Sequence, residues 1–170
     1  MCAKIPRYMR ADNLRLRPLK IFDGPFIING LRNEDVWRAN GLSKPITFSW
    51  FSVWWYLKKT FDLSLCIEID SRRAGFIGLY NLSLGKSAEL SLLLFEKNIR
   101  QCGYGSRAFT LFAKNLKEHS VVKKIIIRVK IDNNAAISFY RALGFNKLSN
   151  LDRIKTMAID LNGHPCRSRS

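Results

Sequence analysis

Two glycines separated by one residue, Gly103 and Gly105, stand in a short polar segment between two apolar stretches. Glycine lets the backbone turn tightly and approach a ligand without interference from a Cβ atom. A helix is expected to begin near Ser106, and the unpaired amides at a helix N-terminus attract anions. Arg100 and Arg107 add positive charge on either side. The segment is therefore predicted to hold a phosphate or a diphosphate.

Two other phosphate-binding patterns fit this chain less well. Residues 103–108 match the dinucleotide pattern G-x-G-x-x-A, which also needs an acidic residue about twenty positions later. That region reads KIIIR, at 124–128, and contains no carboxylate. Gly85-Lys86-Ser87 resembles the end of a Walker loop, but the first glycine of that pattern would fall on Tyr80, and a strand is expected where the pattern needs a helix.

Two motifs together resemble those of the GNAT superfamily, the acetyl-CoA-dependent N-acyltransferases. Residues 100–105 match its R/Q-x-x-G-x-G/A motif, and residues 133–145 resemble its second signature, N-x-x-A-(I)-x-x-Y-x-x-x-G-F. The two motifs stand in the same order as in the family, and the resemblance extends from Leu14 to Leu161. Ala88-Glu89-Leu90 resembles the ribosomal-protein N-acetyltransferase branch.

The resemblance implies where acetyl-CoA binds. The glycine loop would grip the diphosphate, while amides of the preceding strand would pair with the pantetheine arm and polarise the thioester carbonyl. Asn133 is either a helix cap, a site that Asx residues favour, or a ligand of the pantetheine amide. Lys97, Arg100 and Arg107 either meet the remaining phosphate or are solvated charges. The predicted cofactor-binding residues are Leu92, Leu93, Leu94, Phe95, Arg100, Gln101, Cys102, Gly103, Tyr104, Gly105, Ser106, Asn133 and Ala136.

Tyr140 and Glu89 are the predicted catalytic residues. Acetyl transfer to an amine needs a neutral amine and a proton for the departing thiolate. Tyr140 is the candidate acid, or else a core tyrosine on an apolar helix stripe. A free phenol has a pKa of about 10 and a thiol of about 8.5, so this proton donation is weakly driven. Glu89 is the candidate base, or else a carboxylate paired with a surface cation; Glu68 and Asp70 are weaker candidates, and no metal is expected.

The elements that position these residues follow from the periodicity of the apolar residues. Strands are expected at 14–18, 63–69, 74–80, 87–95, 124–129, 145–148 and 155–161, helices at 106–118 and 134–143, and helical pieces over 22–60. Strand, helix and buried strand from Ser87 to Val129 predict a right-handed βαβ unit. The predicted fold is α/β: a GNAT-like mixed, mostly antiparallel sheet of about seven strands flanked by helices. One domain is expected over 1–162, followed by a short basic tail at 163–170.

The aromatic residues before the first long strand have two interpretations. Trp50, Phe51, Trp54 and Trp55 either wall an acceptor pocket or form the apolar face that docks their helix. Arg32-Asn33-Glu34 resembles a polar element near the acceptor side of related enzymes.

Composition limits the class of protein. Apolar residues make up 47% of the chain, enough for a core. The 29 Lys and Arg against 13 Asp and Glu give a net charge of +16, which bears on anionic partners rather than on fold. Four cysteines with no close pair, and no apolar N-terminal run, lead us to expect a cytoplasmic protein with no membrane contact.

The expected function is transfer of an acetyl group from acetyl-CoA to a primary amine by direct attack. The acceptor is expected to be a protein N-terminal amine, with a nucleotide-linked amino sugar as the alternative. Two non-catalytic alternatives are a basic RNA-binding module that kept the fold and a protein that binds acetyl-CoA without turnover. The expected partners are acetyl-CoA, the amine acceptor and an anionic surface such as the ribosome; a monomer and a homodimer remain open.

Overall fold

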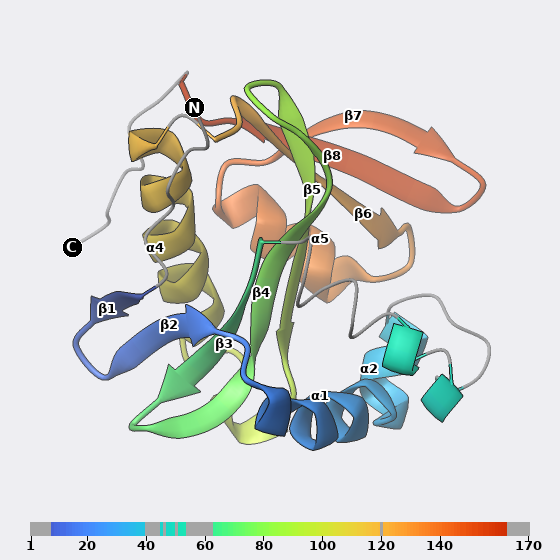
Figure 1. Ribbon diagram of the computed structural model, residues 1–170. Helices are drawn as coiled ribbons and strands as arrows, with labels where there is room; N and C mark the ends of the chain where they lie inside the picture. The colour runs from blue at the N-terminus through green and yellow to red at the C-terminus, as the bar shows by residue number, and fades with distance from the viewer. Residues whose placement is uncertain are drawn as a thin grey trace.

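The computed structural model describes residues 8–39, 45, 47–49, 51–53, 63–119 and 121–162. These residues form an open mixed sheet of eight strands with helices on both faces (Figure 1). The strands are β1 (Met9–Ala11), β2 (Leu14–Pro18), β3 (Leu63–Ile69), β4 (Arg72–Ser83), β5 (Ser87–Leu94), β6 (Lys124–Lys130), β7 (Asn146–Leu151) and β8 (Ile154–Asp160). The helices are α1 (Gly24–Leu31), α2 (Glu34–Ala39), α4 (Tyr104–Glu118) and α5 (Asn134–Ala142), with short 3-10 turns η1 (Ile21–Asp23) and η2 (Lys97–Ile99).

The strands lie in the order β1-β2-β3-β4-β5-β6-β8-β7. Every neighbouring pair is antiparallel except β5 and β6, which are parallel and joined through α4. This confirms the predicted βαβ unit and the mostly antiparallel sheet. The strand count exceeds the expected seven because Met9–Ala11 forms an additional short strand against β2. Helix α4 begins at Tyr104, two residues before its predicted start.

Two apolar layers cover the two faces of the sheet. Alternate strand residues such as Leu16, Leu90 and Ile127 pack with α4 and α5 in one layer. The opposite face carries a smaller layer, in which Phe76 and Phe95 pack with α1, α2 and Phe51. Because strand side chains alternate between faces, a residue next to Leu90 lies on the α1 side. Trp50, Trp54, Trp55 and the predicted tail at 163–170 fall outside the described residues.

Strands β5 and β6 separate along their length, and this separation positions the site. Their pairing covers only Ser87–Glu89 against Lys124–Ile126. Beyond Glu89, β5 continues to Leu94 and β6 continues to Lys130 without pairing to each other. The sheet therefore opens between Leu90–Leu94 and Ile127–Lys130.

Two further findings concern the described residues as a whole. None of the helices found there is long and apolar enough to cross a membrane. The same part of the chain contains no group of three or more His, Cys, Asp and Glu side chains arranged to hold a metal ion.

Candidate active site

The free edge of β5 offers backbone groups to an extended ligand. The Phe95 amide donates to the Ala74 carbonyl at 3.0 Å, so this residue faces β4. Because residues of an antiparallel strand turn their backbone groups alternately to the two sides, Leu93 also faces β4, whereas Leu92 and Leu94 face the opening. Of the four predicted strand residues, Leu92 and Leu94 therefore carry the amides available to a ligand.

The loop after β5 ends at Gly103, which caps α4 with a φ of +80°. This left-handed conformation favours glycine, and a Cβ atom placed there would meet no atom within 4 Å. The first intrahelical bond recorded at this end is from Arg107 to the Gly103 carbonyl. Helix geometry leaves the amides of Tyr104, Gly105 and Ser106 without a partner inside the helix. The loop thus presents open space over a row of amides at the positive end of the helix dipole.

Gly105 has a different role from Gly103. A Cβ atom at Gly105 would approach the Phe139 ring to 3.3 Å, closer than most real Cβ contacts. The second glycine of the motif therefore allows α4 to lie against α5. Gln101 precedes the cap with a φ of +63°, and the exposed Cys102 thiol lies 3.3 Å from the Asn98 carbonyl.

The arginines and the lysine beside the loop contact protein groups. Arg100 donates to the carbonyls of Leu94 and Phe95 at 2.9 and 3.0 Å, which fixes the turn after β5. Arg107 donates to the Asp12 carboxylate at 3.1 Å. Lys97 pairs with Asp35 of α2 at 2.5 Å. A phosphate group near the loop would thus meet backbone amides first, and these side chains only after they leave their present partners.

Asn133 is a helix cap, which is one of the two roles predicted for it. Its side-chain oxygen accepts a hydrogen bond from the Ala136 amide at 3.1 Å, which caps α5. The Ala136 amide is therefore engaged in this cap. Their predicted part in cofactor binding stays a prediction.

Tyr140 lies near the C-terminal end of α5, in an aromatic cluster. It is 8% exposed, and its ring contacts those of Phe139 and Phe145 at centroid distances of 5.0 and 5.2 Å. Burial raises the pKa of the Tyr140 phenol well above its ordinary value, and the nearby Tyr80 contributes in the same direction. The hydroxyl is protonated at neutral pH, as a proton donor must be, and the raised pKa makes it a weaker acid than a free phenol.

Glu89 is a buried carboxylate held by donors from two neighbouring strands. It is 6% exposed and lies on the α1 face of β5. Asn81 of β4 donates to its Oε1 at 2.9 Å, and Arg128 of β6 pairs with the same oxygen at 3.0 Å. The Arg128 side chain is 58% exposed, so this cation lies partly in solvent beside the carboxylate.

Tyr80 is a functional candidate that sequence reasoning missed. It lies directly opposite Glu89 in the β4–β5 register and donates a hydrogen bond to the Glu89 carboxylate. Burial raises the pKa of Tyr80 to about 12, and the charge of Glu89 and this hydrogen bond add to the effect. In the sequence, the signal is an aromatic hydroxyl in the strand before Ala88-Glu89-Leu90, which becomes informative only once the register is known.

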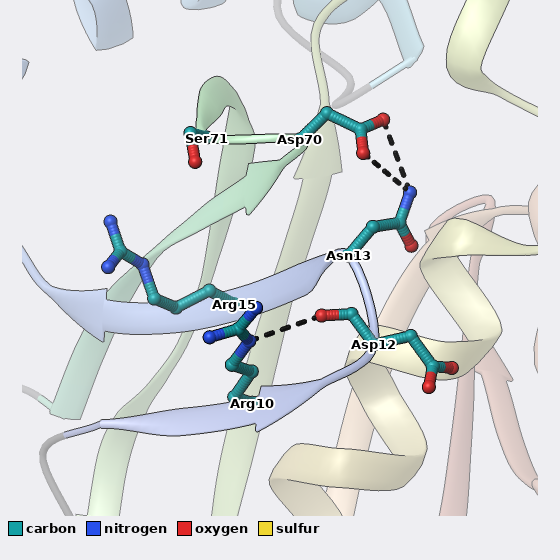
Figure 2. A pocket seen from close by; sticks show the side chains of 6 residues that line it. All are labelled: Arg10, Asp12, Asn13, Arg15, Asp70 and Ser71. Carbon is teal, nitrogen blue, oxygen red and sulfur yellow. Dashed lines mark hydrogen bonds between the residues drawn. The ribbon is translucent and has the colours of Figure 1, made fainter.

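The two weaker base candidates lie in other clusters. Glu68 accepts from Arg15 and from Arg17. Asp70 accepts from the Asn13 amide at 3.2 Å on both oxygens (Figure 2). A hollow of about 390 Å³ lies at these strand turns, lined by Arg10, Asp12, Asn13, Arg15, Asp70 and Ser71. None of the residues predicted to bind acetyl-CoA, nor Tyr140 or Glu89, lines this hollow.

The loop amides and the free edge of β5 together suit a long ligand that has an anionic middle and an extended arm. The amides after Gly103 would hold the anion, and the free edge of β5 would pair with the arm. The arm would then end near Glu89, where the pairing of β5 with β6 stops.

Solved structures share this fold. A domain from Methanocaldococcus jannaschii is 18% identical, with a TM-score of 0.77 over 86% of this chain and 97% of that one. The spermidine N-acetyltransferase of Vibrio cholerae, solved with CoA and spermine, is 19% identical, with a TM-score of 0.72 over 89% of this chain and 98% of that one.

A third structure is an acetyl transferase from Salmonella typhimurium that modifies the N-terminal serine of the 50S ribosomal subunit protein L7/L12. It is 14% identical, with a TM-score of 0.75 over 92% of this chain and 98% of that one. A search of curated proteins finds no significant match. The model of the acetyltransferase (GNAT) family matches residues 32–145, which include both motifs, Glu89 and Tyr140. With most of its length matched and the fold in agreement, the chain belongs to the acetyltransferase (GNAT) family.

Proposed function

We propose that this acetyltransferase transfers the acetyl group of acetyl-CoA to the N-terminal amine of a protein. Acetyl-CoA supplies an activated thioester, and the chain holds this thioester and the amine in the geometry for reaction. Such alignment can lower the activation barrier by several kcal/mol, roughly 7–11 in favourable cases. Amides following Gly103 would hold the diphosphate, and those of Leu92 and Leu94 would hold the pantetheine arm. Glu89 would take up the proton of the acceptor ammonium, and Tyr140 would give a proton to the thiolate.

The observation that supports the choice of acceptor is the net positive charge of the chain. Arg128 lies half exposed beside Glu89, on a chain whose net charge is +16. Such a surface repels a polyamine and favours an acceptor that has one ammonium on an otherwise acidic molecule. An acidic protein N-terminus fits this description, and the likeness to the Salmonella enzyme supports the same choice.

A nucleotide-linked amino sugar is the second candidate acceptor. It also combines one amine with negative charge, so Arg128 and the net charge favour it over a polyamine in the same way. The charge further supports an anionic macromolecular partner, such as the RNA of a ribosome, near which a protein N-terminus would be met.

An acceptor panel tests the proposal by release of free thiol from acetyl-CoA. The panel contains an acidic peptide with a free N-terminal serine, its N-acetylated form, a lysine-rich peptide with the same N-terminus, spermidine and a nucleotide-linked amino sugar. We expect turnover with the free acidic peptide, weaker turnover with the lysine-rich one, and none with the blocked one. Turnover confined to the amino sugar or to spermidine would overturn the choice of acceptor.

A further inference from the structure

Glu89 is buried, which limits direct proton transfer to it from an acceptor in solvent. The residue is 6% exposed, and it lies in a strand between β4 and β6. Asn81 and Arg128 both contact its Oε1. An acceptor ammonium that approaches from solvent is thus separated from the carboxylate by the side chains that hold it. A group that contacts Glu89 and is also accessible from solvent would remove this separation.

Tyr80 meets both requirements. It faces Glu89 across the β4–β5 register, and its hydroxyl donates to the carboxylate. Tyr80 is only partly buried, whereas Glu89 is fully buried. Tyr80 therefore contacts the buried carboxylate and keeps part of its own surface open to solvent.

We propose that Tyr80 is a catalytic residue that relays the proton of the acceptor ammonium to Glu89, an inference that rests on the proposed function. The ammonium N–H bond breaks, and its electron pair stays on nitrogen as the nucleophilic lone pair. The proton forms a new O–H bond on Tyr80, while the original Tyr80 proton passes to the Glu89 carboxylate. One proton leaves the amine and one arrives on Glu89, and Tyr80 ends the step neutral.

The groups around Tyr80 are consistent with a relay through a neutral phenol. The charged groups that shift the pKa of Tyr80 are Glu89 on β5 and Arg128 on β6, and Tyr80 in turn raises the pKa of Tyr140 on α5. Burial and the Glu89 charge oppose ionisation of Tyr80, and Arg128 favours it. A phenol that does not ionise at neutral pH can accept a proton only as it gives up its own. The existing hydrogen bond to Glu89 supplies the path for that second transfer.

Replacement of Tyr80 by phenylalanine tests the relay, because Tyr80→Phe keeps the ring and removes the hydroxyl. The rate is measured with acetyl-CoA and the free-amino acidic peptide from about pH 6.5 to about pH 9.5, a range that spans the α-amino pKa of about 8. We expect a loss in kcat/KM of about 10- to 100-fold at the lower pH. The loss should shrink at the higher pH, where most of the acceptor is already a neutral amine.

Tyr8→Phe is the matched control, since Tyr8 is 63% exposed and lies outside the site; it should follow wild type at every pH. Turnover by wild type that Tyr80→Phe leaves unchanged would overturn the relay and leave the proposed function intact. A loss that is equal at every pH would also overturn it, because a purely structural role predicts that result. Absence of wild-type turnover with every acceptor, despite acetyl-CoA binding, would overturn the proposed function together with the relay.

Discussion

At the residue scale, the two glycines of the loop perform separate tasks. Gly103 leaves space above a helix end and needs a left-handed backbone. Gly105 leaves space on the side of the helix, where Phe139 packs. The sequence motif treats both as parts of a phosphate cradle, but only the first has open space beside it. A substitution at each position should therefore affect different properties.

Gly103→Ala should weaken acetyl-CoA binding by about tenfold or more, which is about 1.4 kcal/mol. The added methyl group would occupy the space next to the amides, and the φ of +80° would strain the backbone. Calorimetric titration with CoA measures the affinity. Gly85→Ala is a matched control, because Gly85 has a φ of +69° and equally open surroundings in a different turn.

Both variants should lose similar stability, about 1 kcal/mol for a non-glycine residue in this conformation. Only Gly103→Ala should lose affinity for CoA. Equal affinities in the two variants would show that the space beside Gly103 is not used for binding.

Tyr140→Phe should lower kcat about 10- to 100-fold, at or below the low end for general acid–base catalysis. The ring contacts with Phe139 and Phe145 would be kept, so the fold and the affinity for acetyl-CoA should change little. Steady-state rates and CoA titration measure the two properties. An unaltered kcat would remove the acid role and leave Tyr140 as a core residue.

At the element scale, a buried ionic network fixes η1 against the sheet. Arg17 of β2 donates to both oxygens of Asp23 at 2.6 and 2.9 Å, and it donates to Glu68 of β3 at 2.6 Å. All three residues are buried. Burial alone would raise the pKa of the Asp23 carboxyl, but hydrogen bonds from Arg17 and the Lys20 amide hold it below its ordinary value. The pKa of Glu68 is lowered in the same way by Arg17 and Arg15.

The network makes stability depend on pH with a definite sign. The unfolded chain binds protons on Asp and Glu below about pH 4, whereas the folded network binds them only at lower pH. Its stabilisation is therefore fully present above about pH 5 and is lost as the pH falls through the lowered folded values. Urea unfolding at pH 7 and at about pH 3.5 should show this loss.

Asp23→Asn should cost about 3 kcal/mol at pH 7, because it leaves the buried Arg17 charge incompletely paired. The difference from wild type should shrink at acid pH, where the wild-type carboxyl also becomes neutral. Glu34→Gln is the control, since that carboxylate pairs with Arg38 in solvent and should have little effect at either pH. A pH-independent cost for Asp23→Asn would contradict the assigned role of its charge.

The sequence predicted most elements because each has a strong local pattern. The run KIIIRVK predicts a strand covered on both faces, and β6 is a strand, but only the face of Ile125 and Ile127 is buried, while Lys124 and Arg128 on the other face are exposed. Helix α4 begins earlier than the predicted Ser106, because helical geometry continues back to Tyr104, next to the left-handed Gly103. The position of Tyr80 opposite Glu89 could not be predicted, because it depends on the β4–β5 register. The ion pair between Arg128 and Glu89 could not be predicted either, because it forms only when β5 and β6, which are far apart in the sequence, lie side by side.

At the scale of the whole molecule, three lysines lie close together at one end of the βαβ unit. Lys86, Lys123 and Lys124 are exposed. Their backbones are adjacent, because the Lys86 carbonyl accepts from the Lys123 and Lys124 amides at 3.0 and 3.1 Å. Among the described residues, no recorded ion pair includes any of these lysines. Three cations on adjacent segments attract a polyanion more strongly than the same charges spread over the surface.

The chain should therefore bind a single-stranded RNA at low salt, with an affinity that falls as salt rises. Fluorescence anisotropy at several salt concentrations gives the slope of log K against log salt. Replacement of Lys86, Lys123 and Lys124 by glutamine should reduce that slope by about 2, since each phosphate contact on a single strand contributes about 0.7. Acetyl transfer to the peptide without RNA should not change, because these lysines lie outside the site.

A second triple variant separates local from overall charge. Arg38, Lys114 and Arg153 each pair with a carboxylate, so their replacement by glutamine removes the same three charges from compensated positions. If the lysine cluster is the contact surface, this variant should keep most of the wild-type slope. Equal losses in the two variants would mean that RNA responds to net charge alone, and an unchanged slope in the lysine variant would place the contact elsewhere on the molecule.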